Sequence, residues 1–341
     1  MNARLKKLFR LLLASAIILA GMIQPGHARN VPSLRFNDEG KFKIVQFTDI
    51  HMKEYHEGKR DSVIELMTAI LGAEKPDLVI LTGDIATSEN VTKAWLAVVQ
   101  PMISARIPWA AVFGNHDWEH GYSNKKIMAY LASRPFNCSL PGPKKLTGSG
   151  NYVLKIKASN KKKTQALVYC FDSNAYSEDR KNREMGEYDW IKFDQIEWYR
   201  KTSKKFTQKN GNSPLPALAF FHIPLPEYKI VQQLKTTVGD KSEPISSPEI
   251  NSGLYSSMLE MKDIMGTFVG HDHNNNFIGC LNHICLGFGC KTGLESYGKL
   301  PKGARVIEIY EGERKFDSWI HTSKINKEYV VSYPKTFAEK N

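Results

Sequence analysis

Side chains able to bind metal ions follow five separate apolar segments of the chain. These imidazole, carboxylate and amide groups belong to Asp49, His51, Asp84, Asn115, His116, Asp117, His222, His271 and His273. Taken singly, each has an ordinary explanation: Asp84 could cap a helix, and His222 could be a hydrogen-bonded core histidine. Taken together, five of the ten histidines accompany three carboxylates, and a buried cluster of that kind needs a counter-charge.

The chemistry of this set points to metal ions. Mixed oxygen and imidazole ligands suit zinc, manganese or iron, and the lack of cysteine in the set argues against a structural zinc site. The set is too large for one ion and fits two ions that share one carboxylate. The residue types therefore predict a dinuclear metal site.

The elements that must position these residues alternate along the chain. Apolar runs predict strands at 42–48, 77–83, 108–114, 151–158, 165–173, 216–223, 266–271, 276–281, 283–289, 304–312 and 316–322. Helical spacing predicts helices at 60–74, 91–105, 188–203 and 250–262. Pro101 could kink or end the second of them. This order predicts an α/β fold, with two packed mixed β-sheets flanked by helices in an α/β/β/α sandwich.

The first 28 residues have the pattern of a secretory signal peptide. A basic segment precedes an apolar stretch, and the small residue Ala28 offers a cleavage site. We therefore expect a signal peptide at 1–28 and a single catalytic domain at 29–341, exported to the periplasm or the extracellular space. An uncleaved membrane anchor is the alternative. No other apolar run is long enough to cross a membrane, so none is expected in the mature chain.

The net charge and the cysteine content limit which binding partners and which disulfides can be expected. The formal net charge of +12 favours anionic substrates, but the basic residues are scattered, so no stable nucleic-acid partner is expected. Five cysteines do not make a disulfide framework. Cys280 and Cys285 flank a possible hairpin turn, and they could pair across two strands or remain thiols.

Five motifs occur in a fixed order along the chain. They are Asp49-Ile50-His51, Gly83-Asp84, Gly114-Asn115-His116-Asp117, His222 and Gly270-His271-Asp272-His273. In this order they resemble the D-x-H, G-D, G-N-H-D/E, H and G-H-x-H pattern of the calcineurin-like metallophosphoesterases. The segments "YDWIKFDQIEWYRKTS" and "NSGLYSSMLE" are similar to the purple-acid-phosphatase-like branch, which has a single catalytic domain. The resemblance runs from about Phe42 to Tyr310.

One departure concerns the ferric site of true purple acid phosphatases. Those enzymes place an iron-binding tyrosine a few residues after G-D, and they have glycine where this chain has His51. Here Asp84 is followed by Ile85, Ala86 and Thr87, with no tyrosine. The resemblance therefore implies a site without a phenolate ligand.

The resemblance also implies roles for the individual residues. It implies a phosphoester hydrolase with two divalent or transition-metal ions (manganese, iron or zinc) and a metal-bridging hydroxide as nucleophile. The first ion would be bound by Asp49, His51, Asp84 and His273. The second ion would be bound by Asp84, Asn115, His222 and His271. His116 would remain unligated and face the phosphate, and Asp117 would orient its ring.

The substrate is less sharply indicated. We expect a phosphomonoesterase acting on a small phosphorylated substrate. A phosphodiesterase or nuclease shares the same metal core, and a secreted binding module without turnover is a third reading, against which the complete ligand set argues. Tyr228, Tyr297 and Lys291 are candidate substrate contacts on the pocket rim, with a plain surface position as the alternative. Glu119 and His120 could reach the pocket rim, but they are expected to be exposed loop residues.

Overall fold

The computed structural model describes residues 31–53, 57–160, 162–178, 181 and 184–338. The architecture below is that of the compact unit that begins at Pro32. The expected signal peptide at 1–28 lies outside the described residues. No helix among the described residues is long and apolar enough to cross a membrane.

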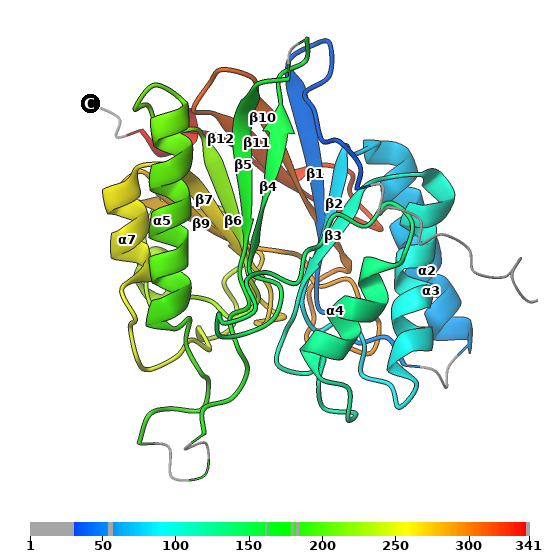
Figure 1. Ribbon diagram of the computed structural model, residues 1–341. Coiled ribbons are helices and arrows are strands. Elements are labelled where there is room, and N and C mark those ends of the chain that lie inside the picture. Colours follow the sequence, from blue (N-terminus) through cyan, green and yellow to red (C-terminus); the bar gives the residue numbers. More distant parts are fainter. Residues whose placement is uncertain (1–30, 54–56, 161, 179–180, 182–183, 339–341) are drawn as a thin grey trace, which may run out of the picture. The chain divides into compact units, whose positions relative to one another are not determined.

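Two mixed, six-stranded sheets form the centre of this unit (Figure 1). The first has the order β12-β11-β10-β1-β2-β3. Its strands are β1 (Lys41–Phe47), β2 (Leu78–Thr82), β3 (Trp109–Val112), β10 (Gly303–Tyr310), β11 (Phe316–Thr322) and β12 (Glu328–Tyr333). β1, β2 and β3 are parallel, and the remaining pairs are antiparallel.

The second sheet has the order β4-β5-β6-β7-β9-β8. Its strands are β4 (Tyr152–Lys157), β5 (Thr164–Cys170), β6 (Ala217–Phe220), β7 (Ile264–Val269), β8 (Ile278–Leu281) and β9 (Ile284–Phe288). β5, β6, β7 and β9 are parallel, and β4 and β8 add antiparallel edges. Cys280 and Cys285 are directly opposed across β8 and β9 and form a disulfide, which decides the pairing that the sequence left open.

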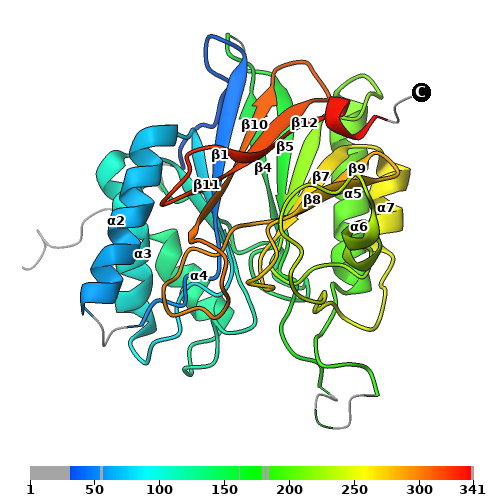
Figure 2. The same ribbon diagram turned by 180° about the vertical axis from the view of Figure 1, so that it is seen from behind.

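Helices cover the outer sides of both sheets (Figure 2). On the side of the first sheet lie α2 (Glu57–Glu74), α3 (Val91–Ala105) and α4 (Asn124–Ala132). On the side of the second lie α5 (Phe193–Lys209), α6 (Tyr228–Gln233) and α7 (Leu254–Met261). A 3₁₀ turn, η1 (Lys335–Phe337), follows β12. The expected fold of two packed mixed sheets flanked by helices is confirmed.

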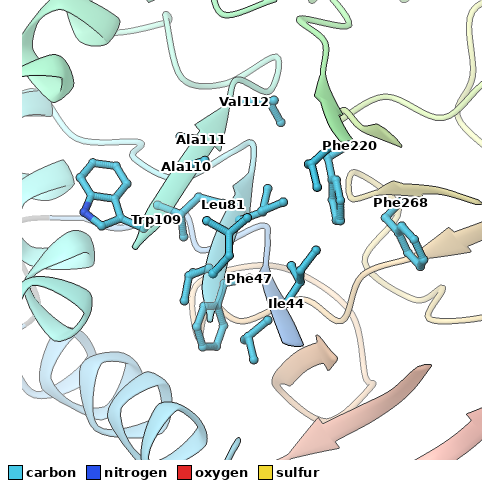
Figure 3. Packing of buried hydrophobic residues seen from close by; sticks show 14 of the residues in the cluster. Ile44, Phe47, Leu81, Trp109, Ala110, Ala111, Val112, Phe220 and Phe268 are labelled. Carbon is cyan, nitrogen blue, oxygen red and sulfur yellow. The ribbon is translucent and has the colours of Figure 1, made fainter. Parts of the chain in front are cut away.

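The core divides according to the two faces of the second sheet. Leu218 and Phe220 of β6 point to the cluster between the sheets, whereas Ala217 and Ala219 belong to the cluster under the helices. This alternation is the period of two that a strand imposes on its side chains. Figure 3 shows Phe220 together with Ile44 of the first sheet among the buried side chains. Because both faces are buried, these strands read as continuous apolar runs.

Several elements differ from those expected. The helix expected at 188–203 spans Phe193–Lys209, because Tyr188 is held in a bridge to Tyr176 and the helix caps at Lys192. By contrast, α3 has the expected span of 91–105 and continues through Pro101. Helices α4 and α6 and strand β12 were not expected.

Candidate metal centre

The candidate ligands lie just beyond the carboxyl ends of parallel strands. In the first sheet these strands are β1, β2 and β3, and in the second they are β6 and β7. Each is followed within three residues by one member of the set: Asp49, Asp84, Asn115, His222 and His271. Carboxyl ends of parallel strands are where open α/β sheets hold their ligands.

The ligand atoms form two groups, within each of which they all lie within 4.8 Å of one another. The first group is Asp49, His51 and His273, and the second is Asp84, His222 and His271. Asp84 connects them, because its Oδ2 lies 3.1 Å from His222 Nε2 and 3.7 Å from His51 Nε2. This placement suits a carboxylate shared by two ions. The structure thus brings together residues that are far apart in the sequence.

Some buried polar atoms of this cluster have no hydrogen-bond partner within the described part of the chain. They include Asn115 Oδ1 and His271 Nε2, whereas His222 Nε2 faces the Asp84 carboxylate at 3.1 Å. Leaving a buried polar atom without a hydrogen bond lowers the stability of the folded state by about 1–3 kcal/mol. Such atoms gathered in one place therefore indicate a site where they would bind a cation. Imidazole nitrogens, an amide oxygen and two carboxylates are a donor set for transition metals. The residues present therefore fit two metal ions.

Contacts behind the ligands fix their directions. His222 Nδ1 lies 2.8 Å from the carbonyl oxygen of Thr82, and because a carbonyl can only accept, Nδ1 carries the hydrogen and Nε2 is left for the centre. The backbone N–H of His271 donates to both oxygens of Asp49, at 3.1 and 3.2 Å. The fold therefore selects Nε2 of His222 as the metal-facing atom and holds the Asp49 carboxylate in place.

Four candidate ligands have backbone conformations that residues with a Cβ rarely adopt. The φ angle is 52° at Asp49, 47° at His51, 52° at Asp84 and 81° at His271. Such left-handed conformations cost on the order of 1–3 kcal/mol each and persist only where the surroundings enforce them. Their concentration at one edge of the sheets is typical of a functional site.

The protonation of the cluster suits metal binding. Burial lowers the pKa of His51 to about 4 and, with the neighbouring His222, that of His271 to about 3. Burial would also lower the pKa of His222, but the adjacent Asp84 carboxylate raises it to about 10. Although burial would raise the pKa of Asp84, His222 and His51 hold it well below its usual range. Neutral imidazoles and ionised carboxylates are the forms that ligate metals, and binding would release the proton of His222.

Asp117 has a different role from the expected one. Its carboxylate is fully buried and accepts the backbone N–H groups of Asp84, Ile85, Ala86 and Gly114. Burial and the nearby Asp84 raise the pKa of Asp117 to about 7, against the effect of these hydrogen bonds. The expectation that Asp117 orients the His116 ring is wrong, because this carboxylate instead joins the loop after β2 to the loop after β3.

Glu119 contacts the His116 ring instead. Its Oε2 lies 2.8 Å from Nδ1 of His116. The expectation that Glu119 is only an exposed loop residue is therefore wrong in part: its side chain is 36% exposed, as is that of His116, but it holds the ring. An ionised carboxylate only accepts, so Nδ1 must donate and Nε2 remains available.

Gly114 is required for space rather than for a left-handed turn. A Cβ at this position would overlap the Asp84 carboxylate and backbone, and Gly114 is not among the residues with positive φ. The loop after β3 can approach the shared carboxylate only because no side chain stands between them.

A pocket of about 440 Å³ opens over the cluster. It is lined by His51, Lys53, Thr87, His116, Glu119, His120, His273, Glu295, Ser296 and Tyr297. The Tyr297 ring stacks on His273 with centroids 4.0 Å apart and is 56% exposed. Of the three expected rim contacts, Tyr297 alone lines this pocket.

The other two expected rim residues lie inside the protein. Tyr228 is fully buried, and its hydroxyl is hydrogen-bonded to Thr267. Lys291 is 2% exposed, and its Nζ donates to the carbonyl oxygen of Tyr297 at 2.6 Å. The expectation of substrate contact is wrong for Tyr228, which packs in the core. Lys291 does not line the pocket, but its hydrogen bond holds the backbone of Tyr297, which does.

Two tyrosines of the cluster were missed by sequence reasoning. The Tyr176 hydroxyl lies 2.9 Å from Asn115 Nδ2. Tyr188 packs edge-on against His271, with ring centroids 4.6 Å apart. Both belong to the long loop between β5 and α5, where the sequence offers no strand end to mark them.

Residues 42–275 match the family model of the calcineurin-like phosphoesterases. The chain belongs to this family. The match covers the strands that carry all the candidate ligands, from β1 to β7. The membership expected from the five motifs is thereby confirmed.

Curated relatives extend the similarity over most of the chain. "Probable inactive purple acid phosphatase 29" of Arabidopsis thaliana is 32% identical over 318 residues, covering 84% of this chain and 81% of the relative. "Phosphatase DCR2" of Saccharomyces cerevisiae is 34% identical over 329 residues, covering 84% of this chain and 54% of the relative. One name denotes an inactive protein and the other a phosphatase.

Solved structures share the fold of this chain. A dimetal phosphatase from Danio rerio superposes with a TM-score of 0.59 at 11% identity, covering 85% of this chain and 98% of that one. The purple acid phosphatase PPD1 from yellow lupin seeds has a TM-score of 0.52 at 13% identity, covering 86% and 53%. These likenesses support the two-sheet fold.

Proposed function

We propose that this calcineurin-like phosphoesterase is a phosphomonoesterase that uses two metal ions to hydrolyse small phosphorylated substrates. The observation that carries the proposal is the pair of ligand groups joined by Asp84, with His116 on the wall of the same pocket. The name of the yeast relative, a phosphatase, supports the same reading. A complete ligand set argues against a binding module that has lost turnover.

The proposed chemistry divides between the ions and the protein. When bound, two ions would supply a water-derived nucleophile at neutral pH and would neutralise charge on the phosphoryl oxygens. The candidate holders are Asp49, His51, Asp84 and His273 for one ion, and Asp84, Asn115, His222 and His271 for the other. Their carboxylates and imidazoles are oriented before substrate arrives, which is the condition for electrostatic stabilisation of the transition state.

His116 acts on the leaving group in this proposal. Glu119 accepts the hydrogen of Nδ1, so the acid in this proposal is the imidazolium form of His116, which carries a second hydrogen on Nε2 and delivers that one. As the oxygen from water bonds to phosphorus, the bond to the leaving oxygen breaks, and that oxygen takes the proton from Nε2 and departs as the alcohol. No covalent enzyme intermediate is required.

Manganese, zinc or iron could serve as the ions. The turn after Asp84 carries Thr87, so no tyrosine of that turn can supply a phenolate. We therefore expect iron-loaded protein to lack the strong visible band of a tyrosinate complex, and an absorption spectrum checks this.

A substrate panel tests the proposal. Purified protein reconstituted with manganese or zinc should hydrolyse p-nitrophenyl phosphate, lose the activity in EDTA and regain it on metal addition. Preference for bis-p-nitrophenyl phosphate or single-stranded DNA would instead indicate the phosphodiesterase or nuclease. Protein that binds two ions but turns over none of the three would indicate the binding module.

We also propose that the chain is exported and that the mature protein begins near Arg29. The support is the order of basic, apolar and small residues before that position. Mass spectrometry of exported protein should find the new N-terminus, and an intact Met1 end would contradict cleavage.

A further inference from the structure

One aromatic side chain of the pocket is exposed and yet held in place. Tyr297 lines the pocket over the candidate centre and is 56% exposed. One face of its ring is covered by His273, with ring centroids 4.0 Å apart and the ring planes 25° from parallel. The opposite face of the Tyr297 ring, with its edges, is therefore what remains open to a ligand.

The polar groups of Tyr297 form hydrogen bonds within the protein. The hydroxyl donates to Glu243 Oε1 at 3.2 Å and accepts from the backbone N–H of His273 at 3.4 Å. Glu243 Oε1 also accepts the backbone N–H of Asn274, at 2.6 Å. The carbonyl oxygen of Tyr297 accepts from Lys291 Nζ at 2.6 Å. Because the hydroxyl hydrogen points to Glu243, the ring offers the pocket an apolar face and not a hydrogen-bond donor.

A ring fixed in this way is prepared for stacking. A ligand that immobilises a mobile side chain must offset the entropy that the side chain loses. The Tyr297 ring is already ordered by its contacts on both the hydroxyl and the backbone, so that cost is largely met before a ligand arrives. Pairs of aromatic rings also stabilise a contact beyond the apolar area that they bury.

The position of Tyr297 relates it to the leaving group. Four rings follow one another in space: the centroids of His116 and His51 are 5.4 Å apart, those of His51 and His273 are 5.2 Å apart, and Tyr297 follows His273. His116 comes from the loop after β3 and Tyr297 from the loop after β9, and both line the same pocket. A leaving group that takes a proton from His116 therefore shares this pocket with the open face of Tyr297.

We propose that Tyr297 is the stacking surface of a leaving-group subsite, and that the substrate is a phosphate monoester whose leaving group is a planar aromatic ring bonded directly to the ester oxygen. The inference rests on the proposed function for the reaction and deepens it by naming the substrate class. Tyr297 stacks on a candidate metal ligand itself, so the subsite begins beside the centre. A nucleobase, by contrast, is separated from its phosphate by a sugar.

Direct binding tests the subsite without requiring turnover. Isothermal titration calorimetry of the full-length, zinc-loaded protein compares phenylphosphonate, cyclohexylphosphonate and methylphosphonate, none of which is a hydrolysable ester. The first two carry six-carbon rings and differ in planarity. We expect the wild type to bind phenylphosphonate ~2–10-fold more tightly than cyclohexylphosphonate, the range for an aromatic pair beyond its buried area, and to bind methylphosphonate more weakly than either.

Three variants separate the aromatic face from its neighbours. Tyr297→Leu keeps an apolar side chain beside His273 but removes the ring, so the preference for phenylphosphonate should disappear while zinc content and methylphosphonate affinity stay unchanged. Tyr297→Phe keeps the ring and should keep the preference. Phe193→Ala is the matched control, because Phe193 is a 71% exposed aromatic residue at the start of α5, outside this pocket, and it should bind all three phosphonates as the wild type does.

The same measurements separate this inference from the proposed function. Preferential binding of phenylphosphonate by protein that hydrolyses no phosphate ester would support the subsite and contradict the phosphatase alone. Equal affinity for the two ring phosphonates in the wild type, or an unchanged preference in Tyr297→Leu, would overturn the inference. Tighter binding of the phosphonate analogue of adenosine monophosphate than of phenylphosphonate would also overturn it, in favour of a nucleotide.

Discussion

Asp84 is the residue on which both ligand groups depend, since its Oδ2 faces His222 and His51. Asp84→Asn keeps the shape but removes the negative charge that two cations share. We expect loss of at least one ion per chain and a fall in kcat/KM of at least about 100-fold, the upper end for contacts merely behind a ligand. Elemental analysis and phosphatase assays measure both. Asp38→Asn, an exposed aspartate before β1, is the matched control, and normal rate with two retained ions in Asp84→Asn would contradict a shared carboxylate.

His116 is the residue proposed to protonate the leaving group, and its replacement tests that role. Its Nδ1 is held by Glu119, and a proton from Nε2 matters most when the leaving alkoxide is poor. Positioned acids contribute ~10²–10⁴-fold, so His116→Gln should lose that much rate on an alkyl phosphate and far less on p-nitrophenyl phosphate. Both ions should remain bound. Equal losses along a leaving-group series would show that His116 only binds phosphoryl oxygens.

At the scale of elements, Asp117 joins the loops that follow β2 and β3. One carboxylate satisfies four backbone N–H groups across these loops. In Asp117→Asn one oxygen is replaced by a donor that faces N–H groups, so hydrogen bonds are lost and replaced by repulsion. Each hydrogen bond to a charged group contributes about 1.5–3 kcal/mol.

We expect Asp117→Asn to lower the free energy of unfolding by about 3 kcal/mol and to reduce metal content, since Asp84 and Asn115 lie on the two loops. Urea denaturation with elemental analysis measures these effects. Asp117→Asn protein with wild-type stability but impaired turnover would restore a direct catalytic role to Asp117.

At the scale of the whole molecule, the candidate centre lies where the two sheets meet. Gln46 of β1 donates to Thr82 in the first sheet and to the carbonyl oxygen of Val269 in the second. His222, from the second sheet, reaches the carbonyl oxygen of Thr82. Ions held by both sheets should therefore stabilise the sandwich as a unit.

Metal removal should lower the melting temperature. A ligand present at 1,000 times its Kd stabilises the folded state by about 4 kcal/mol, which corresponds to roughly 6 °C for a chain of 341 residues. Differential scanning calorimetry with and without EDTA checks the shift, and Asp84→Asn should show a smaller one. Metal-depleted protein that melts at the temperature of the holoprotein would show that the folded state does not bind the ions in preference to the unfolded state.

Local patterns in the sequence determined the strands, the two-sheet class and the family. Apolar runs ending in Asp49, Asp84 or His222 report burial and the end of a strand, both of which are local properties of a chain. Those residues share one face of the fold because parallel strands carry their carboxyl ends to the same edge.

Only the tertiary structure decided which groups stand behind the ligands. Asp117 and Glu119 are both acids close to His116 in sequence, and the loop conformation alone sends the first to backbone N–H groups and the second to the imidazole. Tyr176 reaches Asn115 from a loop 61 residues away, and Tyr228 enters the core although it follows a loop. Such contacts depend on where separate loops meet, and residue type and spacing do not encode that meeting locally.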